Sequence, residues 1–292
     1  MDTVTIITSI LTLIAGIGIF LIACSMMSSN LEALGSGKLK ALFAKASKSK
    51  LVGVGVGTAT CAVIQSSSAT SVMVIGFVNA GIMTLTQAAT VIFGANIGTT
   101  VTGQLVSLGL FGGNSISTSV IFATFAGIGA FVLAFAKNDR AQKAGGIMAG
   151  FGMLFVGLSM MSDAMGYFSG LDSVKNFLAV FRNPFLLVLI GAVFTAIVQS
   201  SSVMTSMAIT MVVTGLISLN QGIYITMGSN IGTCVTALIA GMTSTKNAKR
   251  TALIHLIFNV SGVAVFMLIG LFMGLGGIDY GYLFAKMFPH TP

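Results

Sequence analysis

Gln65-Ser66-Ser67-Ser68 stands in the middle of a long apolar stretch of this chain, and the same block recurs as Gln199-Ser200-Ser201-Ser202. Four consecutive polar side chains are costly to place in apolar surroundings, so such a block is retained where its groups are paired or functional. The two copies are therefore the first indication of both the fold and the site.

A second block repeats with the same spacing. Gly94-Ala95-Asn96-Ile97-Gly98-Thr99 returns as Gly228-Ser229-Asn230-Ile231-Gly232-Thr233, and both pairs of blocks are 134 positions apart, from 65 to 199 and from 94 to 228. One constant offset over separate blocks indicates a duplication with almost no insertions. The sequence predicts two copies of one unit, with repeat 1 at residues 1–134 and repeat 2, the longer, at residues 135–292.

The composition is typical of an integral membrane protein. Hydrophobic residues make up 55% of the chain and charged residues 7%, with a mean hydropathy of +1.01, whereas a soluble domain has roughly 25% charged residues. Apolar stretches of about 20 residues are long enough to cross a bilayer as helices. They lack the alternation with period two that a transmembrane β-barrel shows. The sequence therefore predicts an all-α membrane protein.

The positive charge is concentrated in short connections between the apolar stretches. The net charge is +8, and three basic clusters consist of Lys38, Lys40, Lys45, Lys48 and Lys50, of Lys137, Arg140 and Lys143, and of Lys246, Lys249 and Arg250. Cytoplasmic connections of membrane proteins carry such an excess of Lys and Arg. The clusters thus predict an external N-terminus, and no nucleic-acid partner. The expected location is the plasma membrane, which is the inner membrane of a bacterium.

Two hairpins and two broken helices organise the predicted fold. Gln-Ser-Ser-Ser divides each of the runs 51–81 and 185–215 into arms of about 14 residues, too short to span, so each run predicts a re-entrant helical hairpin. The second block interrupts the runs 84–109 and 219–242, which predict broken transmembrane helices. The other predicted segments are helices at 3–28, 116–136, 144–162 and 251–275 and an interfacial segment at 30–50. Three crossings separate equivalent positions, so inverted-topology repeats are predicted.

The hairpin tips offer groups for an anion. Inverted repeats with broken helices place half-helix ends near the middle of the membrane. Backbone N–H groups and hydroxyls at the start of such a half-helix are suited to a negative ligand. The candidate anion ligands are Ser66, Ser67, Ser68, Ser200, Ser201 and Ser202. If the two tips meet, both serine clusters surround one small oxyanion.

Oxygen-bearing side chains near these tips suit a small cation. Gln carbonyls at the tips, and Asn and Thr oxygens in the predicted helix breaks, are the hard ligands that such cations prefer. The candidate cation ligands are Gln65, Gln199, Asn96, Thr99, Asn230 and Thr233. The six acidic residues fall near span ends or in loops, so neutral oxygens and the anion itself would hold the cation.

The residues alone leave alternatives open. Ser, Thr and Gly also line helix contacts without binding a ligand. An anion channel could use the same serine-lined centre. An intramembrane enzyme would use a serine with His255 as the base, but the chain has no Gly-x-Ser-x-Gly elbow and no acidic partner for that histidine within the predicted spans. We therefore predict no enzyme activity.

Both pairs of blocks resemble those of a known family, the type II sodium/phosphate cotransporters and their bacterial relatives. That family has two inverted repeats, each with a Gln-Ser-Ser-Ser hairpin followed by a Gly-x-Asn-Ile-Gly-Thr segment, as at 65–68 with 94–99 and at 199–202 with 228–233. His255 and Asn259 also resemble a His-x-x-x-Asn pattern in the family's second repeat. The resemblance covers most of the chain.

This resemblance implies sodium-driven import of inorganic phosphate, and the repeat symmetry predicts alternating access. It implies phosphate at the six serines and sodium, as the coupling ion, at the Gln, Asn and Thr candidates. No other metal and no cofactor are expected, so the expected partners are phosphate, sodium and the lipid bilayer. The choice of phosphate over another small oxyanion rests on the resemblance alone. The sequence gives no prediction of oligomeric state.

Overall fold

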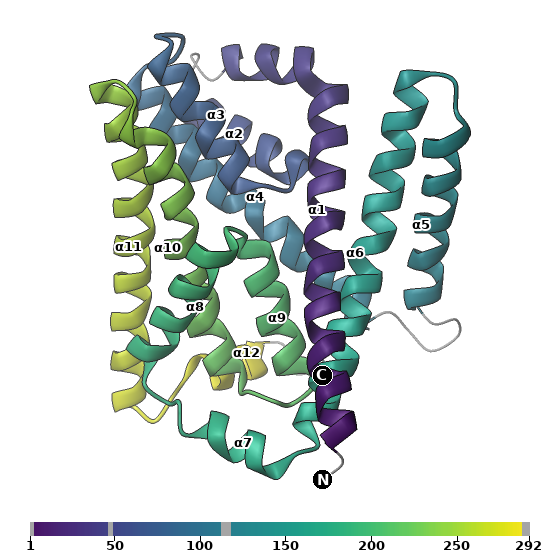
Figure 1. Cartoon of the computed structure of the whole chain (residues 1–292). Helices are drawn as coiled ribbons and strands as arrows, with labels where there is room; N and C mark the ends of the chain where they lie inside the picture. The colour runs from purple at the N-terminus through teal and green to yellow at the C-terminus, as the bar shows by residue number, and fades with distance from the viewer. Residues whose placement is uncertain (1–2, 46–48, 112–117, 288–292) are drawn as a thin grey trace.

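The computed structural model describes residues 3–45, 49–111 and 118–287, and every regular element in these ranges is an α-helix (Figure 1). The helices are α1 (Thr3–Lys45), α2 (Lys50–Ile64), α3 (Ser67–Asn79), α4 (Leu85–Phe111), α5 (Thr118–Phe135), α6 (Asp139–Ser169), α7 (Asp172–Ala179), α8 (Pro184–Val198), α9 (Ser201–Val213), α10 (Leu219–Met242), α11 (Lys246–Leu275) and α12 (Tyr280–Met287). Within the described residues, 5 helices are long and apolar enough to cross a membrane, or up to 6 if the bent pair α7 and α8 forms one span. The prediction of an all-α, multi-pass membrane protein is confirmed.

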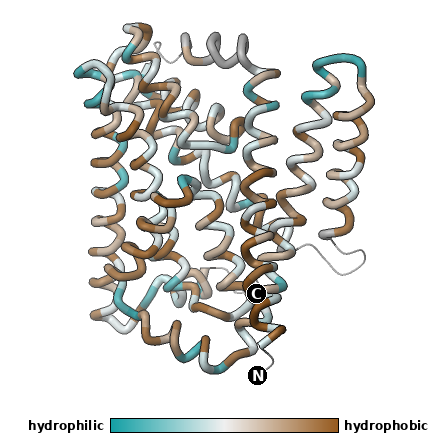
Figure 2. The backbone as a smooth tube through the Cα atoms, in the orientation of Figure 1, coloured by the Kyte–Doolittle hydropathy of each residue, from teal (hydrophilic) through white to brown (hydrophobic). Residues whose placement is uncertain are grey.

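Apolar contacts hold the helices together. One buried cluster joins α3 and α4 to α10 and α11, a second joins α1 and α6 to α9, and a third joins α8 to α12 through α9, α10 and α11. Large apolar side chains also cover the outer surface of α11, where Phe272 is 71% exposed and Leu275 85%. Figure 2 shows that many residues along this helix are hydrophobic. Soluble proteins rarely expose apolar surface on this scale, whereas lipid covers it in a membrane.

A helix–turn–helix forms at each Gln-Ser-Ser-Ser block. Gln65 ends α2 and Gln199 ends α8, both with φ 57°, and they are the only non-glycine residues with positive φ in the described ranges. In this left-handed conformation the chain leaves the helix axis and begins a new helix after one further residue. Figure 1 shows α8 rising to the centre of the molecule and α9 returning from it.

The two halves share this architecture residue by residue. The bounds of α2 and α8, and those of α3 and α9, differ by the offset of the sequence repeat. Gly81 and Gly215, which follow the hairpins, have φ of 71° and 70°. In Figure 1, α1 runs upward and α6 downward, and α2 begins at the upper end of the view whereas α8 begins at the lower end.

The prediction of broken helices at 94–99 and 228–233 is wrong, because α4 and α10 each continue through these blocks. The glycines serve close helix contacts instead. A Cβ on Gly94 would lie 1.9 Å from the carbonyl oxygen of Val54 in α2, and one on Gly228 would lie 2.0 Å from that of Val188 in α8. Gly-rich helix faces allow two backbones to approach in this way. Consequently no backbone carbonyl is released by a break in these blocks.

Another difference concerns the first predicted span. The helix predicted near 3–28 and the interfacial segment predicted at 30–50 are not separate, because α1 continues to Lys45. The polar stretch that precedes the second hairpin contains a short helix of its own, α7. In the first half, the matching stretch belongs to the end of α1, so the two halves differ at the approach to each hairpin. They differ also in their last long helices, because α5 packs mainly against α6 whereas α11 packs against α10, α3 and α4.

The glycine contacts give a direct test of the packing. We expect Gly94→Ala to lower the melting temperature of the detergent-solubilised protein by several degrees, because the added Cβ would meet a carbonyl oxygen and overpacking costs about 1–3 kcal/mol. Gly76→Ala in α3 is the matched control, since a Cβ there meets nothing within 4 Å, and alanine favours a helix over glycine. Equal melting temperatures for the two variants would contradict the contact.

Candidate functional site

The first hairpin tip is held against α4 by its glutamine. The Gln65 side-chain oxygen Oε1 accepts a hydrogen bond from the Thr102 hydroxyl at 2.9 Å, and its Nε2 donates to the carbonyl oxygen of Ala62. The Gln65 backbone N–H donates to Cys61 in α2. Both ends of the amide are therefore engaged, and the side chain is only half-buried.

The serines that follow begin the helix α3. Ser66 is the N-cap, and its hydroxyl oxygen accepts a hydrogen bond from the backbone N–H of Ala69 at 3.1 Å. Its carbonyl oxygen accepts from the Thr70 hydroxyl at 2.9 Å. Ser67 is buried and Ser68 half-buried. The first N–H groups of a helix have no acceptor within it, so this tip presents donors toward the interior of the protein.

The second tip has the same backbone but freer side chains. Ser200 has φ −141° and ψ 106°, close to the −146° and 107° of Ser66, yet its side chain makes no capping hydrogen bond. Gln199 is exposed, and within the described part of the chain its side chain has no hydrogen bond. Ser201 and Ser202 are buried. The second tip therefore leaves an amide and a hydroxyl available to a ligand.

The Asn and Thr candidates project from the continuous helices α4 and α10. Asn96 and Thr99 each donate a hydrogen bond to the carbonyl four residues earlier, and so does Thr233. The Thr99 hydroxyl also lies 3.4 Å from the Cys61 thiol in α2. Asn230 is exposed. Because these bonds use donor hydrogens of Asn96, Thr99 and Thr233, the side-chain oxygens can still accept a hydrogen bond or bind a cation.

A cavity of about 710 Å³ lies along α9 and the first half of α10. It is lined by Ser107 of α4, by Thr205, Ala208, Ile209, Val212 and Val213 of α9, and by Leu219, Gly222, Ile223, Thr226, Met227 and Asn230 of α10. Most of this lining is apolar, with a few polar side chains. Asn230 is the one predicted ligand on it, so the structure gives that residue access from outside the protein core.

The two tips are not joined by direct bonds. No hydrogen bond links the Gln-Ser-Ser-Ser blocks within the described residues, although the predicted arrangement has the tips meeting. Instead α3 packs against α10 and α9 packs against α4, so each hairpin contacts the long helix of the opposite half. This crossed packing brings groups from both repeats toward the interior of one bundle.

His255 and Asn259 lie beside the second Asn-Ile-Gly-Thr block. Both are buried on α11, and the Asn259 amide donates hydrogen bonds to the His255 carbonyl oxygen at 3.0 Å and to the Cys234 sulfur at 3.3 Å. Cys234 follows Thr233 directly. The pair predicted from its one-turn spacing therefore attaches α11 to the site helix α10. The His255 Nδ1 atom has no hydrogen-bond partner among the described residues.

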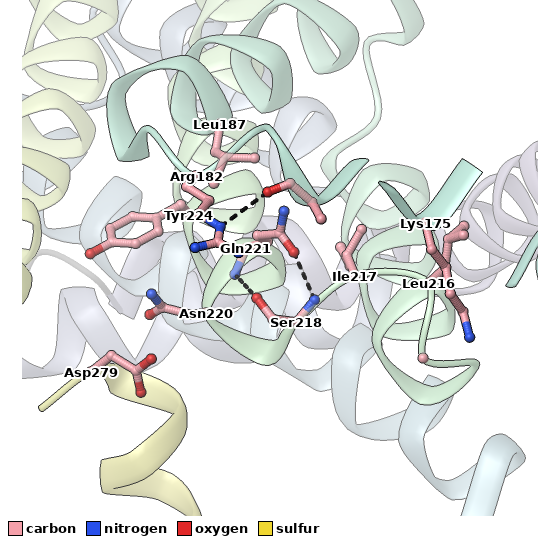
Figure 3. A pocket seen from close by; sticks show the side chains of 12 residues that line it. Lys175, Arg182, Leu187, Leu216, Ile217, Ser218, Asn220, Gln221, Tyr224 and Asp279 are labelled. Atoms are coloured by element: carbon pink, nitrogen blue, oxygen red, sulfur yellow. Dashed lines mark hydrogen bonds between the residues drawn. The ribbon is translucent and has the colours of Figure 1, made fainter. Parts of the chain in front are cut away.

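A second cavity, of about 550 Å³, contains none of the predicted ligands (Figure 3). Lys175, Arg182 and Asp279 contribute both signs of charge to its lining. Beside it, the Gln221 side chain donates hydrogen bonds to the Leu178 and Phe181 carbonyl oxygens at 3.0 and 3.1 Å. These bonds attach the end of α7 to the start of α10, and Gln221 also completes a capping box with Ser218.

Sequence reasoning missed Gln221 and Thr102. The Ser-x-x-Gln spacing at 218–221 is a known signal for a capping box, and the first half has a comparable Thr84 and Gln87 pair. Thr102 could have been found as a further repeated residue, because Thr236 occupies its position in the second half. Neither residue stands inside the two repeated blocks.

Known relatives include bacterial and mammalian proteins. The chain is 34% identical over 204 residues to the uncharacterized protein YqeW of Bacillus subtilis, covering 70% of this chain and 64% of that one. It is 24% identical over 260 residues to the putative inorganic phosphate export protein YjbB of Escherichia coli K12, covering 89% and 46%. It is 39% identical over 115 residues to the rat sodium-dependent phosphate transport protein 2B, covering 36% and 16%. The chain thus spans less than two thirds of the length of these relatives, and no solved structure matches it.

A family match covers both halves of the chain. Residues 19–163 and 166–282 match the family described as Na+/Pi-cotransporter. These ranges contain both Gln-Ser-Ser-Ser blocks, both Asn-Ile-Gly-Thr blocks and the pair His255 and Asn259. The family suggested by the repeated blocks is therefore confirmed: this multi-pass membrane protein belongs to the Na+/Pi-cotransporter family.

Proposed function

We propose that the chain imports inorganic phosphate together with sodium, by alternating access between two inverted repeats. The observation that carries this proposal is the pair of interior helix starts at Ser66 and Ser200, which have matching backbones and stand on opposite hairpins. Membership of a sodium/phosphate cotransporter family supports the two cargoes. The proposal extends to a bacterial inner membrane as the location.

Phosphate is proposed to bind at the six serines of the two tips. A helix start offers N–H groups and a partial positive charge, and serine hydroxyls add further donors. The free hydroxyl of Ser200 supports this role, since it makes no capping hydrogen bond in the described structure. A site built from neutral donors holds an oxyanion less tightly than one built from Lys or Arg, and transport requires release on the far side.

Sodium is proposed to bind to neutral oxygens at Gln65, Gln199, Asn96, Thr99, Asn230 and Thr233. In the described part of the chain, no group of three or more His, Cys, Asp or Glu side chains could hold a metal ion. Sodium and phosphate would then neutralise each other, because no described carboxylate contacts the proposed ligands. This arrangement supports obligate coupling: each ion should bind weakly without the other. The continuous helices exclude one predicted source of ligands, the carbonyls of a broken α4 or α10.

The proposal includes two repeats of opposite orientation, 1–134 and 135–292, which would give the two related end states of alternating access. The opposite directions of α1 and α6 in Figure 1, and the opposite ends at which α2 and α8 begin, are those that inverted topology requires. The polar connections between α5 and α6 and between α10 and α11 lie at the same end of the molecule (Figure 2). They carry two of the three basic clusters, which supports a cytoplasmic position for that end and re-entrant hairpins from opposite sides.

Other cargoes and mechanisms give different transport results. The YjbB relatives are named as phosphate export proteins, so direction is part of the proposal; an inward sodium gradient drives a coupled anion inward. A serine-lined anion channel would conduct without sodium and without saturation. A transporter of another small oxyanion would retain the sodium dependence and prefer a different anion.

The first test is uptake of labelled phosphate into proteoliposomes that contain the purified chain. We expect concentrative uptake under an inward sodium gradient and none under an equal potassium gradient, because phosphate has no fixed positive partner in the site. Unlabelled sulfate in excess tests the choice of anion and should not compete. Equal uptake with both cations would contradict coupling, and sodium-driven loss of preloaded phosphate would contradict import.

Substitutions at the tips test the assignment of ligands. Ser66→Ala and Ser200→Ala should each raise the KM for phosphate about tenfold, since a hydrogen bond to a charged group contributes about 1.5 kcal/mol. Gln65→Ala and Gln199→Ala should mainly raise the sodium concentration required for half-maximal uptake. Ser261→Ala is the control, because its hydroxyl bonds to the carbonyl of Ile257 on the exposed face of α11. Unchanged uptake in all four tip variants would overturn the site.

A further inference from the structure

The two halves differ at one matched pair of residues. In the first half, the Thr102 hydroxyl donates to the Gln65 side chain at 2.9 Å. The repeat offset places Gln199 and Thr236 at the corresponding positions. There the Thr236 hydroxyl is buried without a hydrogen-bond partner among the described residues, and Gln199 is exposed. The same two residue types are thus bonded in one half and separated in the other.

The backbone does not explain this difference. Gln65 has φ 57° and ψ 26°, and Gln199 has φ 57° and ψ 25°. Both glutamines end helices of 15 residues, and both hairpins are held to a long helix by glycine contacts. A buried hydroxyl without a partner is unfavourable, because it has lost water and gained nothing in exchange. Thr236 therefore has a bond to gain in another arrangement of the same chain.

The packing around the hairpin also differs between the two halves. The cavity along α9 and α10 is lined in part by Ala208, Ile209, Val212, Gly222 and Thr226. Their counterparts in the first half form part of a buried apolar cluster with Ala237, Ala248 and Ala252 of α10 and α11: they are Val74, Ile75, Val78, Ala88 and Ile92. Among the described residues, these positions are covered by α10 and α11 in the first, closed half, whereas in the second, open half they line a cavity.

We propose that Gln65–Thr102 and Gln199–Thr236 are two alternating latches of the transport cycle. In the present state the first latch is closed and holds the first hairpin against α4. In the opposite state Gln199 bonds to Thr236, the cavity along α4, α9 and α10 closes, and the first latch opens. This inference rests on the proposed alternating access and makes Thr102 and Thr236 positioning residues, which act through the glutamines.

The test measures accessibility, with no phosphate or sodium gradient. Two reporter substitutions, Thr226→Cys in the open half and Ile92→Cys in the closed half, are introduced separately after Cys24, Cys61 and Cys234 have been replaced by serine. The full-length chain is purified in detergent, and its rate of labelling by a water-soluble maleimide is measured. Without further substitutions the open-half reporter should label quickly and the closed-half reporter slowly, since Ile92 is fully buried.

Thr102→Val and Thr236→Val are then added to each reporter background. Valine removes the hydroxyl and conserves the shape, and the loss of one hydrogen bond should shift the ratio of the two states about fivefold. Thr102→Val should slow the labelling of the open-half reporter and accelerate that of the closed-half reporter. Thr236→Val should do the reverse, and Thr102→Ser should behave like the parent.

The opposite signs separate a latch from other roles. If a variant accelerates labelling at both reporters, it loosens the fold and the latch is contradicted. If Thr236→Val changes the sodium requirement of uptake but leaves both labelling rates unchanged, Thr236 is a cation ligand and the latch is again contradicted. Thr236→Val remains informative if Thr102→Val does not fold, because it removes no bond from the present state. A chain without phosphate uptake can still show the opposite shifts, so the two proposals fail separately.

Discussion

The close contact between the first arm of each hairpin and the following long helix determines the rest of the structure. Gly57 of α2 and Gly94 of α4 each stand where a Cβ would lie 1.9 Å from a backbone oxygen of the other helix. Gly191 and Gly228 have the same relation between α8 and α10. Because no side chain separates the two backbones, their contact fixes the position of each hairpin tip along the long helix. The position of the polar tips inside an apolar bundle follows from that contact.

A site of this kind combines polar groups with very little fixed charge. The tips provide hydroxyls, amides and helix N–H groups, and the long helices provide Asn and Thr oxygens, while the described acidic and basic side chains stand near the ends of the molecule. A permanent charge within the bundle would bind one ion tightly and hinder its release. Neutral groups instead make the strength of binding depend on which ions are present together. The proposed coupling of the two ions is a consequence of the lack of fixed charge in the site.

Much of the fold could be predicted from the sequence, because an interrupted apolar run and a constant repeat offset are both visible in one chain. As expected from the Gln-Ser-Ser-Ser blocks, α2 and α8 end just before these blocks, and α3 and α9 begin within them. The prediction of helix breaks at 94–99 and 228–233 was wrong for a physical reason. Glycine both weakens a helix and allows a close contact, and the choice between these explanations depends on a neighbouring helix that the local sequence does not specify.

The difference between the halves lay beyond sequence reasoning. The residues Gln65 and Thr102 recur as Gln199 and Thr236, so a repeat predicts identical bonds in both copies. Only the packing of α3 and α4 against α10 and α11 shows which copy is closed. The cavity beside Asn230 likewise depends on which helices cover α9 and α10. The same residue types thus take two different arrangements within one structure, and tertiary contacts determine which half takes which.

Glutamine in a left-handed backbone conformation has one more consequence. This conformation is unfavourable for a residue that has a Cβ, whereas glycine adopts it without strain. Both hairpins nevertheless have a glutamine there. The Cβ of the tip residue therefore destabilises the turn, and the same atom carries the amide that is proposed to bind a ligand. A glycine at 65 or 199 would relax the turn while it removed the amide, so a variant of this kind could be more stable and less active than its parent. Resistance to heat would be a poor guide to function in this protein.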